Sequence, residues 1–148
     1  MTDKEIMLAG FTQKILREKG FTEWKIEFGR ASNNYGLCKY KKKVIRYSKL
    51  LVEANSLERS KLTALHEIAH VIVGPGKGHG PLWKKACIEL GGDGIRCYST
   101  KNTVVIKGKW VGTCDICGKE FFRYRKPKGS LTYKHSTCGG KLTFKKEN

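Results

Sequence analysis

One pentapeptide, His66-Glu67-Ile68-Ala69-His70, constrains the fold of this chain more than any other segment. Residues four apart lie on the same face of an α-helix, so a helix here lets both imidazoles reach one metal ion. Glu67 follows His66 directly, so its carboxylate reaches a zinc-bound water instead of completing the ligand set. The pattern requires a helix over this segment, and it indicates a zinc hydrolase with Glu67 as general base.

The flanking sequence predicts that helix and supplies a third ligand. Asn55 and Glu58 have the spacing of a capping box, and Gly74-Pro75 ends the helix. A glycine-rich loop then brings His79 back, and Pro81 suits the first position of another helix that runs to about Leu90. The apolar stripe of the first helix comprises Leu62, Leu65, Ala69, Ile72 and Val73. We therefore expect His66, His70 and His79 to hold one zinc ion with an open position.

The residues before this motif predict one more helix and a short sheet. Thr2 and Glu5 form a capping box for a first helix that Gly20 closes. Trp24–Phe28 alternates apolar and polar residues, as a half-buried strand does. Segments 35–40 and 44–48 are expected to pair as a hairpin, with the lysines at 41–43 at its turn. The fold class is α+β: a small zincin-like domain with helices packed on a short β-sheet, followed by a β-rich module.

That module begins where the composition changes, so we predict domains at residues 1–100 and 101–148, with the boundary between 99 and 107. Cys114-Asp115-Ile116-Cys117-Gly118 has the form of a zinc knuckle, and His135 precedes Cys138 by three positions. Cys114, Cys117, His135 and Cys138 together predict a closed structural zinc site in a zinc ribbon. The stretches 121–125 and 131–133 are expected to form its hairpin. A degenerate ribbon with reduced metal affinity and a redox CxxC are less favoured alternatives.

Charge suggests a polyanionic partner. The net charge is +17, and residues 101–148 hold 12 Lys and Arg against 3 acids. Basic side chains beside aromatic rings are typical of proteins that bind single-stranded nucleic acid. We predict contacts with DNA, single-stranded or without sequence preference, because no recognition helix is evident. The alternatives are that the charge serves solubility and that the aromatic rings form the ribbon core. The candidate residues are Lys119, Arg123, Tyr124, Arg125, Lys126 and Lys128.

Cysteine usage and hydropathy bear on the compartment. No signal peptide is visible, and no apolar run approaches the roughly 20 residues of a membrane span. The six cysteines are therefore expected to be thiols or metal ligands. Cys38, Cys87 and Cys97 are interpreted as small buried hydrophobes. We expect a monomer without membrane contact, cytoplasmic and associated with DNA, and not secreted.

The motif and its spacing resemble a known family. His66-Glu67-x-x-His70, eight further residues and then His79-Gly80-Pro81-x-Trp83 are similar to the SprT-like (Spartan) metalloproteases. The resemblance extends over most of the chain, from the strand at 24–28 to the cysteine module. It implies that the three histidines bind zinc and that Glu67 is catalytic. It also implies a substrate class, proteins bound or crosslinked to DNA, and a ribbon in which a cysteine is usual at position 135.

Two alternatives to a protease remain open. The first is a non-catalytic, zinc-containing nucleic-acid-binding or regulatory protein, in which the helical zinc is structural. The second is a metal hydrolase acting on another bond, because the same metal and base serve several chemistries. The group that stabilises the oxyanion is also open, with Lys77, Arg96 and Tyr98 as candidates.

Overall fold

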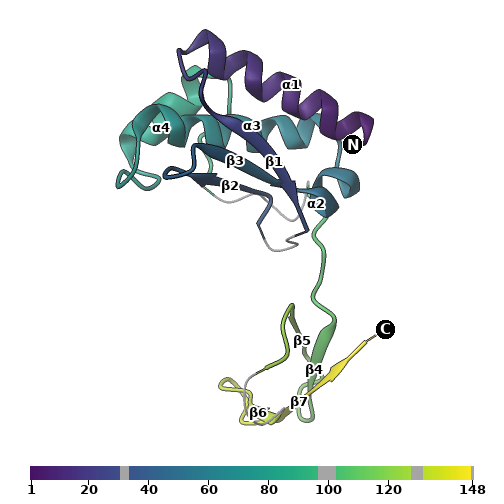
Figure 1. Cartoon of the computed structure of the whole chain (residues 1–148). Helices are drawn as coiled ribbons and strands as arrows, with labels where there is room; N and C mark the ends of the chain where they lie inside the picture. The colour runs from purple at the N-terminus through teal and green to yellow at the C-terminus, as the bar shows by residue number, and fades with distance from the viewer. Residues whose placement is uncertain (31–33, 97–102, 128–131, 148) are drawn as a thin grey trace. The chain divides into compact units, whose positions relative to one another are not determined.

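The structure is a computed structural model that describes residues 1–30, 34–96, 103–127 and 132–147. It divides into two compact units, Met1–Val105 and Ile106–Asn148 (Figure 1). The first combines helices with a mixed sheet, and the second is formed by strands. The predicted α+β class, with a terminal cluster of cysteine and histidine suited to a zinc ribbon, is confirmed.

The first unit packs helices against a sheet of three strands. The sheet order is β1-β3-β2, with β1 parallel and β2 antiparallel to β3. Helix α3 contacts α1, α4 and β2, and Figure 1 shows it running behind the sheet. The elements are α1 (Asp3–Glu18), β1 (Lys25–Gly29), β2 (Gly36–Lys39), β3 (Val44–Ser48), α2 (Lys49–Ala54), α3 (Leu57–Val73) and α4 (Pro81–Glu89).

The core of this unit lies between the inner sheet face and the helices. Ile45 and Tyr47 alternate along β3 on that face, and both are fully buried. The Tyr47 hydroxyl lies 2.8 Å from Oγ1 of Thr12 on α1, which satisfies two buried polar groups. Cys38 and Gly36 pair with these two β3 residues, so they occupy the same face of the sheet. The edge strand β2 therefore turns its inner face towards α3.

Several predicted elements are confirmed. The hairpin of 35–40 and 44–48 appears as β2 and β3, joined by a turn that includes the three lysines. The Thr2 hydroxyl accepts a hydrogen bond from the Glu5 amide at 3.2 Å and caps α1. Gly20 closes that helix with φ 86°, a value that favours glycine. The first strand lies one residue later than predicted, at Lys25–Gly29.

The predicted cap of the motif helix is wrong by one residue. Ser56, not Asn55, caps α3, because its hydroxyl accepts from the Arg59 amide at 3.1 Å. Asn55 instead follows the short helix α2, which was not among the predicted helices. Its amide donates to the carbonyls of Leu51 and Val104, both at 2.9 Å, and accepts from the Val104 amide. Long-range bonds to residue 104 thus compete with the local capping role.

The second unit is a sheet of four antiparallel strands in the order β5-β4-β7-β6. The predicted hairpin between 121–125 and 131–133 is wrong, because β5 and β6 lie at opposite edges of this sheet. β5 pairs with β4, and β6 pairs with β7. Leu142 and Phe144 form the small core together with Cys114, and Trp110 and Phe121 pack against it. The strands are β4 (Trp110–Cys114), β5 (Glu120–Arg123), β6 (Thr132–Lys134) and β7 (Lys141–Lys146).

Within the described part of the chain, none of the helices has the length and apolar composition needed to cross a bilayer.

Candidate functional site

Three histidines converge at the end of α3. His66 and His70 lie one turn apart on that helix, and His79 approaches them from the following loop. Nε2 of His79 lies 3.0 Å from Nε2 of His66 and 3.1 Å from Nε2 of His70. Zinc bound tetrahedrally at 2.0–2.1 Å places its nitrogen ligands about 3.3 Å apart. The three nitrogen atoms therefore have the chemistry and nearly the spacing of one zinc site with an open fourth position.

The loop between α3 and α4 determines where His79 lies. Gly74, Gly76 and Gly78 have φ values of 82°, 83° and 54°, a region that side chains other than glycine rarely adopt. The Gly74 amide donates to the carbonyl of His70 at 2.9 Å and ends the helix. Pro81 then begins α4. The glycine-rich spacing between His70 and His79 is thus a sharp reversal that returns the third histidine to the helix.

Trp83 supports all three imidazoles. Its side chain is 1% exposed, and its indole Nε1 donates to the carbonyl of His66 at 3.1 Å. Its ring centroid lies 4.7 Å from that of His66, 5.6 Å from His70 and 4.8 Å from His79. The Tyr40 hydroxyl also donates to the carbonyl of His70 at 3.3 Å. Packing on two elements therefore fixes the rings before any ligand is added.

The environment keeps these histidines neutral, as metal ligands must be. Burial, together with the neighbouring imidazoles, lowers the pKa of His66 to about 4. Burial and the proximity of His79 lower the pKa of His70 to about 4 as well. The pKa of His79 is also lowered, by burial and by the charge of Arg96. Because the three imidazoles are neutral, each has a nitrogen lone pair that can bind a metal cation.

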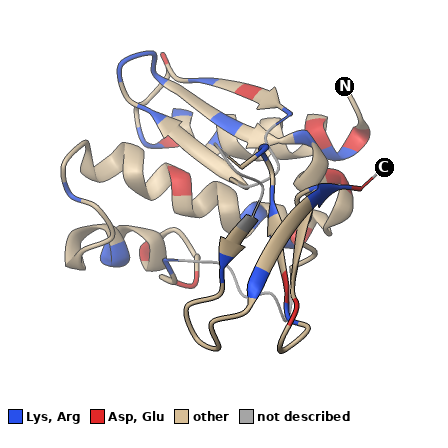
Figure 2. Ribbon diagram, turned by 90° about the horizontal axis from the view of Figure 1, so that it is seen from below, with Lys and Arg blue, Asp and Glu red and all other residues tan. Residues whose placement is uncertain are grey.

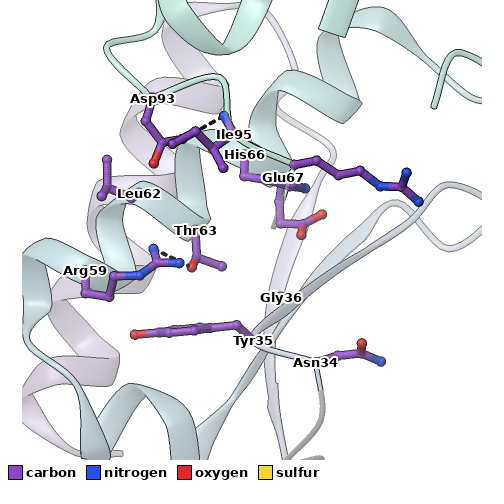
Figure 3. Close-up of a pocket in the computed structure, with 11 residues that line it drawn as sticks. Asn34, Tyr35, Gly36, Arg59, Leu62, Thr63, His66, Glu67, Asp93 and Ile95 are labelled. Atoms are coloured by element: carbon purple, nitrogen blue, oxygen red, sulfur yellow. Dashed lines mark hydrogen bonds between the residues drawn. The ribbon is translucent and has the colours of Figure 1, made fainter. Parts of the chain in front are cut away.

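Glu67 is buried beside the cluster. Its side chain is 6% exposed, and burial raises the pKa of its carboxyl group to about 7. Figure 3 shows the carboxylate directed into a cavity towards Gly36. A Cβ added at Gly36 would lie 3.0 Å from Cγ of Glu67 and 2.8 Å from Cγ2 of Thr63, so a side chain does not fit at this position. The glycine of β2 thus makes room for the carboxylate of α3.

The second unit contains the other predicted cluster. Sγ of Cys114 lies 3.3 Å from Sγ of Cys138, which lies 3.1 Å from Nδ1 of His135. The same Nδ1 lies 3.5 Å from Sγ of Cys117, so all four ligand atoms are close enough for one metal ion. Hydrogen bonds from the backbone amides of Cys117 and Ile116 lower the pKa of Cys114 to about 6, which favours the thiolate. Three sulfurs and one nitrogen at these distances suit zinc.

The predicted DNA-contacting residues lie on β5 and in the segments that flank it. Lys119 precedes the strand, with its Nζ 5.3 Å from the centroid of the Phe121 ring. Arg123 ends the strand, and Arg125 and Lys126 follow, all exposed. The Tyr124 hydroxyl donates to the carbonyl of Ile106 at 2.6 Å, and its ring is 47% exposed. Figure 2 shows Lys and Arg on several strands of this unit. Lys128 lies outside the described residues.

Phe121 and Phe122 separate into the two roles considered from the sequence. Phe121 belongs to the ribbon core, where its ring centroid lies 5.1 Å from that of His135. Phe122 points to the opposite face and is 37% exposed, with Nζ of Lys107 at 4.9 Å from its ring centroid. Of these two phenylalanine rings, only that of Phe122 is therefore available for stacking with a ligand.

Of the remaining cysteines, Cys87 fits the interpretation as a small buried hydrophobe, whereas Cys38 is only half-buried. Cys38 and Cys87 are free, and Cys87 is 1% exposed. Burial raises the pKa of Cys38 to about 12, so this thiol stays protonated. Cys97 lies outside the described residues. Among the described residues, neither Cys38 nor Cys87 belongs to either cluster.

Sequence reasoning missed the contributions of Trp83, Tyr40 and Gly36, which arise from tertiary packing. A signal was present for Trp83, which lies four residues after His79 in the helix that begins at Pro81. Of the three candidates for oxyanion stabilisation, Arg96 lines the cavity next to Glu67. Lys77 does not line that cavity, and Tyr98 lies outside the described residues.

A helix-borne HExxH pair, a third histidine and a small mixed sheet place the first unit in the zincin-like class. The model of the SprT-like family matches residues 5–103, two thirds of the chain. The chain therefore belongs to the SprT-like family, which is associated with metallopeptidase activity. A comparison with curated proteins found no match.

Gly36→Ala tests the close approach of β2 to Glu67. The added methyl group overlaps the side chains of Thr63 and Glu67, so we expect unfolding to require about 1–3 kcal/mol less free energy. The displaced carboxylate should also lower proteolysis. Chemical denaturation and a cleavage assay measure the two effects. Gly10→Ala on α1, where an added Cβ meets nothing within 4 Å, is the matched control and should lose neither stability nor activity. Equal behaviour of both variants would contradict the account.

Proposed function

We propose that the protein is a zinc-dependent endopeptidase in which His66, His70 and His79 hold the metal and Glu67 is the general base. The observation that carries this proposal is the convergence of three imidazole nitrogens beside a cavity that the buried Glu67 also lines. Nε2 of His79 lies 3.0 Å from Nε2 of His66 and 3.1 Å from Nε2 of His70, and His66 and Glu67 share the cavity wall. A purely structural site needs no carboxylate beside an open coordination position.

The roles of the groups follow from their chemistry. A zinc ion supplies a Lewis acid that polarises a carbonyl and acidifies water. Glu67 accepts the proton of the attacking water as the new carbon–oxygen bond forms at the peptide carbonyl. It then delivers that proton to the departing amine as the carbon–nitrogen bond breaks. Trp83 and the carbonyl contact of Tyr40 hold the histidines in place during this sequence.

We further propose that the substrates are proteins bound or crosslinked to DNA. The second unit supports this with its charge, 12 basic against 3 acidic residues over 101–148, and with exposed Phe122 and Tyr124 among them. Lysine and arginine neutralise phosphates without reading sequence, and aromatic faces stack on unpaired bases. DNA binding by the ribbon would then concentrate protein substrates near the peptidase unit.

A cleavage assay tests this proposal. The zinc-loaded protein is incubated with basic DNA-binding proteins, with and without single-stranded DNA, at several salt concentrations. We expect cleavage that requires DNA, falls steeply with salt and stops with a chelator. Glu67→Gln is the control for contaminating proteases. Two bound zinc ions without cleavage of any DNA-bound protein would instead favour the non-catalytic nucleic-acid-binding alternative.

A further inference from the structure

Lysines gather at one end of the three-stranded sheet in the first unit. The start of β1 and the turn between β2 and β3 both lie at this end (Figure 1). Lys25 and Lys39 each pair with Val44 of β3, so these three side chains lie on one face of the sheet. The Lys25 amide also donates to the carbonyl of Lys43 at 3.0 Å. We call this surface the hairpin patch, and it consists of Trp24, Lys25 and residues 39–43.

The positive charge of the hairpin patch is only partly neutralised within the protein. Residues 39–49 include six basic side chains and no acidic one. Lys43 approaches Glu23 at 3.2 Å. Lys39 approaches Glu27 at 3.9 Å. Because neighbouring charges of one sign repel each other, an anionic ligand would stabilise this end of the sheet. In the described part of the chain, three exposed lysines of the patch form no ion pair: Lys25, Lys41 and Lys42.

An aromatic pair lies within the hairpin patch. The ring centroids of Trp24 and Tyr40 are 6.3 Å apart, and the ring planes are at 89° to each other. In such an edge-to-face pair, Tyr40 covers at most one face of the indole, and Trp24 is only half-buried. Proteins that bind single strands use aromatic faces to stack unpaired bases and nearby lysines to contact phosphates. The hairpin patch combines both kinds of group.

Tyr40 also connects the hairpin patch to the helix that carries two of the histidines. Its hydroxyl donates to the carbonyl of His70 at 3.3 Å, in the last turn of α3. The patch therefore adjoins the end of the metal-binding helix within the first unit. A ligand held there would lie on the same unit as the three histidines, whatever the second unit binds.

We propose that the hairpin patch is a binding site for single-stranded nucleic acid, in which the lysines contact phosphates and Trp24 stacks on a base. The inference goes beyond the proposed function, which assigns DNA binding to the second unit. It requires neither peptidase activity nor a second unit that binds DNA. The alternative for the lysines is that they only protect the turn and the sheet edge.

An NMR titration of the zinc-loaded full chain with a short oligothymidylate tests this site. The indole N–H signal of Trp24 and the amide signals of residues 39–43 should shift. The indole signal of Trp83 is the internal control, because that side chain is 1% exposed and donates to the carbonyl of His66. Trp24→Phe assigns the indole signal. A titration with oligouridylate then shows whether DNA or RNA binds more tightly at the same signals.

A charge-matched pair of double variants gives a second readout, the salt dependence of binding to fluorescent oligothymidylate. Each phosphate contact of a single strand contributes about 0.7 to the slope of log affinity against log salt. Replacing both Lys41 and Lys42 with Gln should therefore lower that slope by about 1.4 and weaken binding several-fold at low salt. Replacing Lys14 and Arg17 of α1 with Gln removes the same charge outside the patch and should leave the slope unchanged.

The outcomes separate this inference from the proposed function. Shifts confined to residues 106–147, or an unchanged slope in the Lys41 and Lys42 variant, overturn the hairpin patch as a site and leave the proposed function standing. Equal binding of oligoglutamate at the patch would contradict nucleic acid as the partner, and equal shifts of Trp24 with a DNA duplex would contradict base stacking. Shifts in the patch with none in the second unit support the inference and contradict DNA binding by the ribbon.

Discussion

Glu67→Gln is expected to lower the rate of proteolysis by about 10²–10⁴-fold or more while the chain stays folded and keeps its zinc. The substitution preserves the size of a side chain that is 6% exposed, so packing against Gly36 should persist. It removes the carboxylate that takes a proton from water and returns it to the amine. Single-turnover cleavage rates, zinc content and thermal unfolding, measured on the same preparations, separate catalysis from folding.

The matched control is Glu58→Gln on the same helix. Glu58 lies in the first turn of α3, and its exposed side chain approaches Lys61 at 3.6 Å. An exposed pair of this kind contributes little to stability. This variant should therefore cleave at the rate of the wild type. A Glu67→Gln protein that retains zinc and cleaves as fast as Glu58→Gln would show that another group serves as base.

Cys114→Ser is expected to remove one zinc ion and unfold the second unit. The apolar core of that unit is small, with Leu142 and Phe144 as its main buried side chains. Structural zinc contributes about 10–16 kcal/mol in small zinc modules, which equals or exceeds the whole stability of a typical domain. The substitution should therefore collapse the dispersed amide signals of residues 106–147 in a two-dimensional NMR spectrum. The signals of the first unit should remain.

Zinc content gives the second readout of this prediction, falling from two ions per chain to one. DNA-dependent cleavage should fall with it, whereas metal binding at the histidines should not. Ser136→Ala, beside His135 but not among the four ligands, is the control and should keep both ions. A Cys114→Ser protein with two zinc ions and an intact ribbon spectrum would contradict the assigned ligand set.

The first cluster was predictable because its geometry is local. His66 and His70 are one helical turn apart, and the glycines before His79 allow only a sharp return. By contrast, the contact of Gly36 with Glu67 joins β2 to α3, and the spacing of residues in the sequence does not predict it. Trp83 shows the intermediate case, since its helix was predicted but its contact with three imidazoles was not.

The two wrong predictions also result from contacts between residues that are distant in sequence. The ribbon hairpin was predicted from neighbouring strand-like segments, but β4 pairs with β7, whose residues lie about thirty positions later, and that pairing separates β5 from β6. Asn55 is a residue type that commonly caps helices, but its side chain forms hydrogen bonds with the backbone of Val104 instead. Local propensity is overridden wherever a distant partner satisfies the same polar group.

The central claim is that three histidines hold a catalytic zinc ion with one open position. Anomalous scattering at the zinc edge from crystals of the zinc-loaded protein tests it directly. The account predicts a peak about 2.0–2.1 Å from Nε2 of His66, His70 and His79, with no fourth protein ligand and with Glu67 beside the open position. A peak confined to the ribbon, or a fourth side chain closing the histidine site, would contradict it.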